Sequence, residues 1–206
     1  MTRWIFDLES DGLLKQMTKL HCLVLRNADT NEVKTYDGDK IKDGLFLLMN
    51  AEEAIGHNII AFDIPAIQKL YPDFEIVGRI TDTLVLSRLI ATTLAEKDTI
   101  RYRKDPESFP RRLVGSHSLR AWGLRLKNLN SDYDGGWEEY THDKLHYYIQ
   151  DTDITHALYK KLMTTKISQQ QHDIEPLTPD TTTSIAHTNQ TQATTNEHTA
   201  NTPTTI

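Results

Sequence analysis

The chain has 206 residues with a formal net charge of −6, a length that suits one domain of ordinary size followed by a tail. The negative charge excludes steering toward nucleic acid by the whole molecule and leaves only local basic patches for that role. The single cysteine, Cys22, excludes an internal disulfide, and the lack of a signal-peptide pattern or an apolar run of about 20 residues predicts a soluble, cytoplasmic protein.

The first part of the chain is expected to form strands. Apolar residues predict strands over residues 3–8, 19–26 and 32–36. A helix is expected over residues 45–54, and a short apolar strand over residues 54–60 follows it.

The next part is expected to be mostly helical. The predicted helices cover residues 63–71, 84–90, 116–126 and 142–163. Residues 91–115 read as an irregular, basic stretch, and Asp82 or Thr83 is expected to cap the second helix. Strands followed by alternating strands and helices indicate an α/β domain with one mixed sheet.

The pattern stops at about residue 167. Residues 178–206 contain twelve threonines and no aromatic residue. Such a segment cannot bury enough apolar area to offset the entropy of ordering it. The sequence therefore predicts an ordered domain over residues 1–166 and a disordered, threonine-rich, low-complexity tail over residues 167–206.

Two carboxylates, Asp7 and Glu9, end the first predicted strand as a D-x-E pair. Side chains alternate along a strand, so both carboxylates lie on the same side. Two like charges held this close repel each other unless a cation lies between them. A D-x-E pair alone is more often an exposed strand end than a binding site.

A third carboxylate, Asp63, stands where a buried strand leads into a helix. It closes the motif Asn58-x-x-x-Phe62-Asp63. Taken alone, Asp63 could simply complement the helix dipole, and Phe62 could simply belong to the core.

The last predicted helix carries a fourth carboxylate on its apolar face. From Asp151, the residues Ile154, Leu158 and Leu162 follow at i+3, i+7 and i+11, and Tyr147 shares this face one turn earlier. A carboxylate directed at a core requires a partner. That partner is either an arginine in a salt bridge or a metal ion.

The four acids indicate more together than each does alone. Asp7, Glu9, Asp63 and Asp151 offer only oxygen ligands, which suit Mg²⁺ or Mn²⁺ rather than zinc. Two such ions about 4 Å apart clamp the attacking and leaving oxygens in phosphoryl transfer. The sequence thus indicates a two-metal site of the kind used in phosphoryl transfer.

The motifs D-x-E, N-x-x-x-F-D and Y-x-x-x-D, in this order, resemble the three motifs of the DnaQ-like (DEDD) 3′–5′ exonuclease superfamily. A narrower resemblance is to the proofreading exonuclease domain of the family A DNA polymerases of T-odd, short-tailed phages. The blocks that carry it are residues 19–22, 57–66, 82–90, 115–123 and 147–151. The resemblance covers about residues 1–165 and implies a ribonuclease H-like fold, with a mixed five-stranded sheet flanked by helices.

The resemblance also implies roles for these residues. Asp7, Glu9 and Asp151 would hold one Mg²⁺ (or Mn²⁺) ion, and Asp63 would help hold a second ion that Asp7 bridges. Tyr147 would position the attacking water, because a tyrosine of pKa ~10 is a poor base at neutral pH. The product is a nucleoside 5′-monophosphate.

His146 is the alternative to Tyr147 as the group that acts on water. It lies five residues before Asp151, where the histidine branch of the superfamily keeps its general base.

Contacts to a nucleic-acid strand are expected from two groups of residues. Phe62 and Leu13 could pack against terminal bases, and Asn58 belongs to the same motif as Phe62. Basic residues in the irregular stretch could bind backbone phosphates or could form a solvated loop. These basic residues are Arg101, Arg103, Lys104, Arg111 and Arg112.

The implied activity is a proofreading-type 3′–5′ DNA exonuclease acting on single-stranded DNA or a frayed primer 3′ end. Family A polymerases continue into further domains, so a stand-alone exonuclease or the exonuclease part of a split polymerase is expected. A separate polymerase subunit is then a possible partner, whereas no thioredoxin and no membrane are expected. Two alternatives stay open: a ribonuclease of the same superfamily, and a non-catalytic module that binds primer ends or a polymerase.

Overall fold

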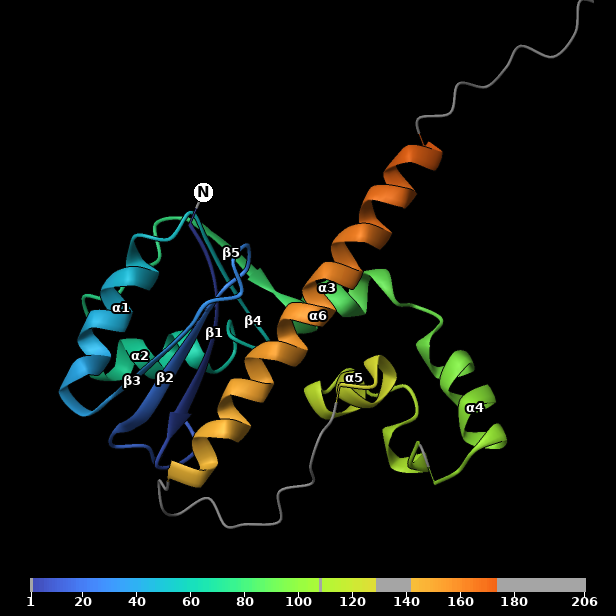
Figure 1. Ribbon diagram of the computed structural model, residues 1–206, viewed down its shortest axis with the longest axis horizontal. Coiled ribbons are helices and arrows are strands. Elements are labelled where there is room, and N and C mark those ends of the chain that lie inside the picture. The colour runs from blue at the N-terminus through green and yellow to red at the C-terminus, as the bar shows by residue number, and fades with distance from the viewer. Residues whose placement is uncertain (1, 108, 129–141, 174–206) are drawn as a thin grey trace, which may run out of the picture. The chain divides into compact units, whose positions relative to one another are not determined.

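The computed structural model describes residues 2–107, 109–128 and 142–173. Its centre is a five-stranded sheet in the order β3-β2-β1-β4-β5 (Figure 1). The strands are β1 Arg3–Ser10, β2 Leu20–Asn27, β3 Val33–Asp37, β4 Glu53–Gly56 and β5 Arg79–Asp82. β1, β2 and β3 pair antiparallel, whereas β4 runs parallel to both β1 and β5, so the sheet is mixed, as predicted.

β1 is the central strand and has core residues on both faces. On one face Phe6 belongs to the largest core cluster. On the other face Ile5 packs with Tyr159 of the long helix α6 His142–Asp173. Because side chains alternate along a strand, Asp7 lies on the face of Ile5, which α6 covers.

Two helices cover the opposite face of the sheet. They are α1 Ile41–Met49 and α2 Asp63–Leu70, and Figure 1 shows both on the other side of the sheet from α6. Leu48 of α1 and Ile67 of α2 are fully buried in the same cluster as Phe6.

Three shorter helices pack with α6 to form a second core. They are α3 Thr83–Ile90, α4 Leu94–Lys104 and α5 Leu119–Leu126. This core joins residues of α4, α5 and α6, and its buried members are Leu94, Trp122, Ile154, Leu158 and Leu162.

The helix α4 corrects the prediction of an irregular stretch over residues 91–115. Its high charge conceals a buried i, i+4 pair, Leu94 and Asp98. The Asp98 carboxylate pairs with Arg125 of α5 (2.6 Å), which anchors α4 to its neighbour. One charged residue of this segment, Asp98, is therefore buried and stabilises the packing of the helix, which composition alone does not reveal.

The boundaries around β4 also differ from the prediction. α1 lies earlier than the helix expected over residues 45–54, because Glu53 belongs to the sheet. Its carboxylate accepts a hydrogen bond from Thr81 Oγ1 (2.6 Å) and pairs with Arg79 Nη2 (2.6 Å), which ties β4 to β5. β5 was not predicted because its first residues, Arg79 and Ile80, are exposed at the sheet edge and have the sequence character of a loop.

The last helix is longer than predicted. α6 continues past residue 163 to Asp173, so the tail expected from residue 167 begins as helix. The rest of that expected tail, residues 174–206, lies outside the described residues.

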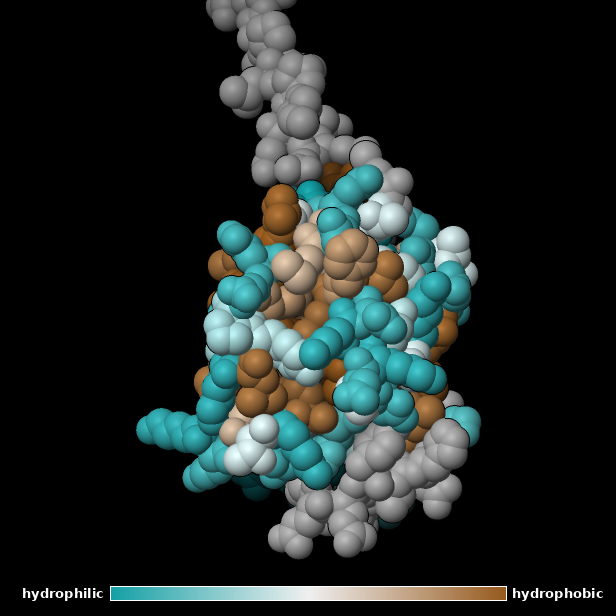
Figure 2. Space-filling model, turned by 90° about the vertical axis from the view of Figure 1, so that its left-hand side faces the viewer, coloured by the Kyte–Doolittle hydropathy of each residue, from teal (hydrophilic) through white to brown (hydrophobic). Residues whose placement is uncertain are grey.

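The surface over α1 is mixed in character. Figure 2 shows apolar patches separated by polar side chains on the side that carries α1. Phe46 of α1 is 66% exposed and borders a groove of about 360 Å³ that α1 forms with residues 70–74. In the part of the chain that the structure describes, no helix has both the length and the apolar character needed to cross a bilayer.

Candidate active site

β1 places two carboxylates at one end of the sheet. Asp7 and Glu9 lie opposite Val24 and Cys22 of β2. The parallel pairing of β1 with β4 ends at Ile5, so both acids extend beyond the carboxyl end of β4. An irregularity in the pairing directly after Glu9 ends the regular ladder, as bulges next to functional sites often do.

The segment between β4 and α2 brings Asp63 to the same end of the sheet. The Asp82 carboxylate accepts hydrogen bonds from the backbone N–H groups of Asn58 (2.9 Å) and Ile60 (3.1 Å). Asn58 has a φ of 69°, which a strand does not allow. Residues 57–60 therefore form a turn instead of the end of the strand predicted over residues 54–60.

Asp82 and Thr83 hold this segment in place by hydrogen bonds to Asn58, Ile60 and Gly56, and we call this pair of residues the clamp. Asp82 also caps α3 by accepting a hydrogen bond from the Leu84 N–H (2.9 Å), so the predicted cap is confirmed. Thr83 Oγ1 donates to the Gly56 carbonyl (3.0 Å) and lies 2.9 Å from His57 Nδ1. The sequence analysis found the cap but missed the clamp.

Asp63 is buried between α2 and β1. Burial raises the pKa of Asp63 to about 7, and the charge of Asp82 acts in the same direction. The backbone of Leu8, which lies between the two acids of β1, acts to lower the pKa of Asp63.

α6 presents Asp151 on its buried face. Ile154, Leu158 and Leu162 are all at most 3% exposed, which confirms the predicted apolar face of this helix. Burial raises the pKa of Asp151 to about 6.

An arginine close to Asp151 binds other groups. Arg26 of β2 pairs with Asp153 (3.5 Å) and donates to Thr152 Oγ1 (3.2 Å) and to the Ile149 carbonyl (3.2 Å). Among the described residues Asp151 has no ion-pair partner, so the salt-bridge alternative for Asp151 is wrong.

The negative charges of the other three acids act on Asp7. The pKa of Asp7 is raised well above its usual range, first by burial and then by the negative charges of Asp151, Asp63 and Glu9. Residues that are far apart in the chain are therefore close enough in the fold to repel. We call Asp7, Glu9, Asp63 and Asp151 the carboxylate cluster.

The carboxylate cluster has the chemistry of a site for a hard divalent cation. All its donors are oxygens, and within the described ranges Asp7, Asp63 and Asp151 have no cationic side chain as ion-pair partner. As the side chains stand, no three acidic, histidine or cysteine groups of the described chain are close enough together to hold a metal ion. A bound ion would therefore require these side chains to move from their present positions.

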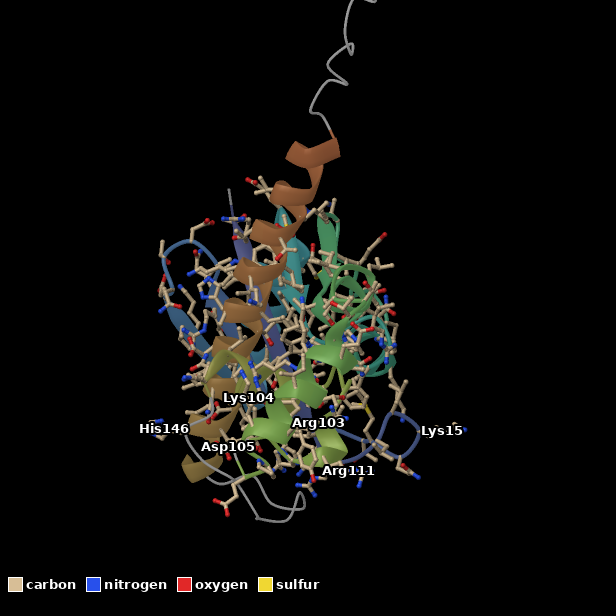
Figure 3. All side chains as sticks on the ribbon, turned by 90° about the vertical axis from the view of Figure 1, so that its right-hand side faces the viewer. Lys15, Arg103, Lys104, Asp105, Arg111 and His146 are labelled. Carbon is tan, nitrogen blue, oxygen red and sulfur yellow. The ribbon has the colours of Figure 1, made fainter. Side chains whose placement is uncertain are left out.

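Tyr147 and His146 differ in their surroundings at the start of α6. Tyr147 is half-buried, whereas His146 is exposed. Figure 3 shows His146 standing out from the lower part of α6, away from the other labelled residues.

A cavity of about 480 Å³ adjoins the carboxylate cluster. It is lined by residues 8–13 and Phe62, and so includes Glu9 itself. Leu13 is 73% exposed at this cavity, and Phe62 is half-buried. The structure thus brings Glu9, chosen as a metal ligand, together with Phe62 and Leu13, which were chosen as contacts for terminal bases.

A second cavity, of about 650 Å³, lies along the clamped segment. His57 and Asn58 line it together with Arg88 of α3 and residues 115–119. Arg88 is exposed and was not among the residues chosen from the sequence, because it is one cation on a helix that otherwise looks like packing.

The basic residues chosen from the sequence lie on helices. Arg101, Arg103 and Lys104 form the last turn of α4, and Arg111 and Arg112 begin the 3₁₀ turn η2 Arg111–Leu113. All five are exposed. Figure 3 shows Arg103, Lys104 and Arg111 on one side of the molecule, with Asp105 beside them. We call these five residues the basic face.

Comparison of the sequence with known proteins finds two phage polymerases. The chain is 32% identical to the DNA-directed DNA polymerases of Escherichia phage T7 and of Enterobacteria phage T3. Each match covers 79% of this chain and 27% of the polymerase, so the chain spans little more than a quarter of the length of these relatives. No protein-family model matches the chain.

Comparison of the structure finds nucleases. A structure described as the apo form of a nuclease has a TM-score of 0.54 and 19% identity, covering 84% of this chain and 76% of its own. Brucella melitensis NrnC with bound Mg²⁺ has a TM-score of 0.53 and 16% identity, covering 84% of this chain and 77% of its own. At this identity the likeness concerns the fold, and it confirms the predicted ribonuclease H-like class.

Proposed function

We propose that this chain, which has a DnaQ-like exonuclease fold, is a metal-dependent 3′–5′ DNA exonuclease. The premise is its resemblance to the exonuclease domain of the T7 and T3 phage DNA polymerases. The carboxylate cluster is the observation that carries this proposal. Its members come from β1, α2 and α6, and burial together with the negative charges of Asp151, Asp63 and Glu9 raises the pKa of Asp7. Such an arrangement is costly unless cations bind there.

Asp7, Glu9, Asp63 and Asp151 would hold two Mg²⁺ (or Mn²⁺) ions. Bound divalent ions would supply an activated water and neutralise the charge on the leaving oxygen. NrnC, which shares the fold, has been solved with bound Mg²⁺. The carboxylates themselves stay ionised in this state, because a bound cation lowers the pKa of each one.

Tyr147 would orient the attacking water through its phenol group. It shares the helix of Asp151 and is half-buried one turn away. A phenol of pKa ~10 keeps its proton at neutral pH, so its role is orientation and not proton removal. The exposure of His146 favours Tyr147 over His146 for this role.

The cavity beside Glu9 would take the last base of the strand. Phe62 and Leu13 give it one aromatic and one exposed apolar side chain, which bind unpaired bases without sequence preference. The second cavity, with Asn58 and Arg88, and the basic face would hold phosphates further along the strand. A base can enter the first cavity only when it is unpaired, which suits single-stranded DNA or a frayed primer end.

A ribonuclease of the same fold and a non-catalytic binding module are the two competing functions. RNA presents the same phosphodiester as DNA, so the four carboxylates by themselves do not distinguish the two substrates. The intact set of four carboxylates with Tyr147 favours catalysis over binding alone.

Digestion of 5′-labelled single strands tests the proposal. With Mg²⁺, we expect a ladder of products shortened one nucleotide at a time from the 3′ end, faster on DNA and on mismatched primers than on RNA. Asp7→Ala should abolish the ladder, while Asp39→Ala, an exposed acid in the turn η1 Gly38–Lys40, should not. Faster digestion of RNA would identify a ribonuclease, and strand binding without any cleavage would identify a binding module.

A polymerase partner is a further part of the proposal. The relatives carry the matched region inside a single longer polymerase chain. A polymerase is therefore the partner that this resemblance favours, and co-elution of this chain with a polymerase, together with faster removal of mismatched primer ends, tests that idea.

A further inference from the structure

A third cavity, of about 280 Å³, lies among α3, α4, α5 and α6 and shares no lining residue with the carboxylate cluster. Its wall combines apolar residues of the second core with Lys97, Arg101, Arg125 and Lys161. We call it the α4–α6 cavity.

Two side chains in its wall carry buried N–H groups with unused hydrogen-bonding capacity. Trp122 is 2% exposed, and the Arg125 side chain is 5% exposed. Within the described residues, Trp122 Nε1 and Arg125 Nη1 have no hydrogen-bond partner. An unpaired buried donor costs about 1–3 kcal/mol, so two such donors in the wall of one cavity require an explanation.

The Arg125 guanidinium is held rigidly. Its Nε and Nη2 groups donate to the two oxygens of Asp98 (3.1 and 2.6 Å). Its centre lies 4.8 Å from the Trp122 ring centroid and 5.3 Å from that of Phe109. Only Nη1 is left for another acceptor, and its position is fixed before any ligand arrives.

The rim of the cavity is positively charged. Lys97 and Arg101 of α4 and Lys161 of α6 are exposed, and none of them has a carboxylate partner in the described chain. Asp98 is the one acid among the described wall residues, and Arg125 already neutralises it. The cavity is therefore lined by two residues that carry unpaired N–H groups and by three cations without a counter-charge.

We propose that the α4–α6 cavity binds a terminal phosphate group, either free phosphate or the phosphate of a nucleoside monophosphate. A terminal phosphate carries close to two negative charges and three acceptor oxygens at neutral pH. Three uncompensated cations suit this dianion better than a carboxylate or a phosphodiester, each of which carries one charge. A volume of about 280 Å³ is at the small end of ligand pockets and suits a mononucleotide at most.

This inference does not depend on the proposed function. None of the residues that carry it belongs to the carboxylate cluster, and the ligand can be tested without metal and without turnover. Only Arg101 also belongs to the basic face, so it is left unchanged in the test.

The indole N–H resonance of Trp122 in a ¹⁵N–¹H spectrum of the full chain reports on the site directly. In EDTA and at constant ionic strength, inorganic phosphate should shift this resonance to a saturable end point, because Trp122 lines the cavity and a bound anion changes the surroundings of its indole. Deoxyadenosine monophosphate is the second probe: tighter binding than inorganic phosphate assigns the site to nucleotides, and equal or weaker binding assigns it to free phosphate. Binding should weaken as pH falls from 7.5 to 5.5, because the phosphate loses its second charge with a pKa near ~6.

Matched variants separate a site from a general effect of charge. Lys97→Gln and Lys161→Gln should each weaken binding about two- to fivefold, a range typical of exposed ion pairs, whereas Lys40→Gln in η1 should not. The Trp4 indole, in the other core, serves as an internal reference that should not move. Equal shifts with acetate or deoxyadenosine, a shift that never saturates, or lysine variants that bind phosphate like the unaltered protein would each overturn the proposal.

Discussion

Asp7 is the residue on which the charges of the other three acids act. Burial and those charges raise its pKa, and burial is the main cause that raises the pKa of Asp63 to about 7 and that of Asp151 to about 6. A carboxyl group with a higher pKa in the folded than in the unfolded state contributes its stability below the unfolded pKa. That contribution is lost as pH rises through the folded pKa.

The metal-free protein should therefore lose stability as pH rises from about 4 to about 7. Asp7→Asn removes the central charge, so it should flatten this loss and raise the melting temperature at pH 8 in EDTA by about 2–4 °C, corresponding to about 1 kcal/mol at this chain length. Calorimetry across pH measures both effects, and Asp39→Asn is the matched control. An Asp7→Asn protein that melts below the unaltered one at pH 8 would contradict the mutual repulsion.

Tyr147 and His146 can be separated by rate. Tyr147→Phe keeps the ring and removes the group that would hold water, so it should slow single-turnover cleavage at least about tenfold, in the lower range of losses for groups that act on the attacking water. His146→Ala should change the rate by less than about twofold, because the side chain is exposed. The reverse order, with a rate profile breaking near pH ~6.5, would place this chain in the histidine branch.

At the residue scale, the sequence identifies the candidate metal ligands better than it identifies the residues that hold them in position. The four acids could be chosen because strand alternation and helical spacing fix which face each one occupies. Asp82 could not be assigned as the clamp of Asn58, because that contact joins segments 24 positions apart through backbone N–H groups. The partner of Arg26 is a similar case, since Asp153 and Asp151 are both acids of α6 and only the fold distinguishes them.

The clamp at the start of α3 is the element on which the position of Asp63 depends. Asp82→Ala would leave the N–H groups of Asn58 and Ile60 and the cap of α3 without their acceptor, and it should cost about 2 kcal/mol or more. It should also raise the Mg²⁺ concentration that gives half-maximal cleavage. Leu48→Ala in α1 should lower stability by a similar or larger amount yet leave the Mg²⁺ requirement unchanged. An unchanged Mg²⁺ requirement in Asp82→Ala would show that the clamp is purely structural.

The basic face should govern the salt dependence of strand binding. Arg103→Gln, Lys104→Gln and Arg111→Gln together should reduce the slope of log affinity against log salt by about 0.7 for each phosphate of a single strand that the variant no longer binds. Titrations of a fluorescent oligonucleotide at several salt concentrations measure the slope. Lys40→Gln with Lys42→Gln, on the α1 side of the molecule, should leave it unchanged, and an unchanged slope in the triple variant would remove the basic face from the interface.

At the element scale, prediction succeeded where apolar periodicity is strong and failed where charge or brevity hides it. β1 and β2 have buried apolar runs and were located within two residues at each end. α4 was missed because only Leu94 and Asp98 of its eleven residues are buried, and one of these is charged. β5 was missed because four residues at a sheet edge leave no alternation to detect.

For the whole molecule, the mixed sheet and the resemblance to phage polymerases followed from the order of motifs, and both are confirmed. The extent of the folded domain stays a prediction. We expect a protein of residues 1–173 to melt within about 2 °C of the full chain, because residues 178–206 contain twelve threonines and no aromatic residue and so offer little apolar area to a core. It should also cleave single strands at the same rate. A large loss of either property would show that residues 174–206 take part in the fold or in the reaction.

The carboxylate cluster combines residues of the first strand and of the last described helix, so its members are synthesised at different times. A ribosome delivers Asp7 long before Asp151, and a chain that has not yet been extended to residue 151 holds at most three of the four acids. If the cluster cuts nucleic acid as proposed, the growing polypeptide is harmless to the messenger and genome around it. Cutting ability arrives only when α6 has emerged and docked across β1.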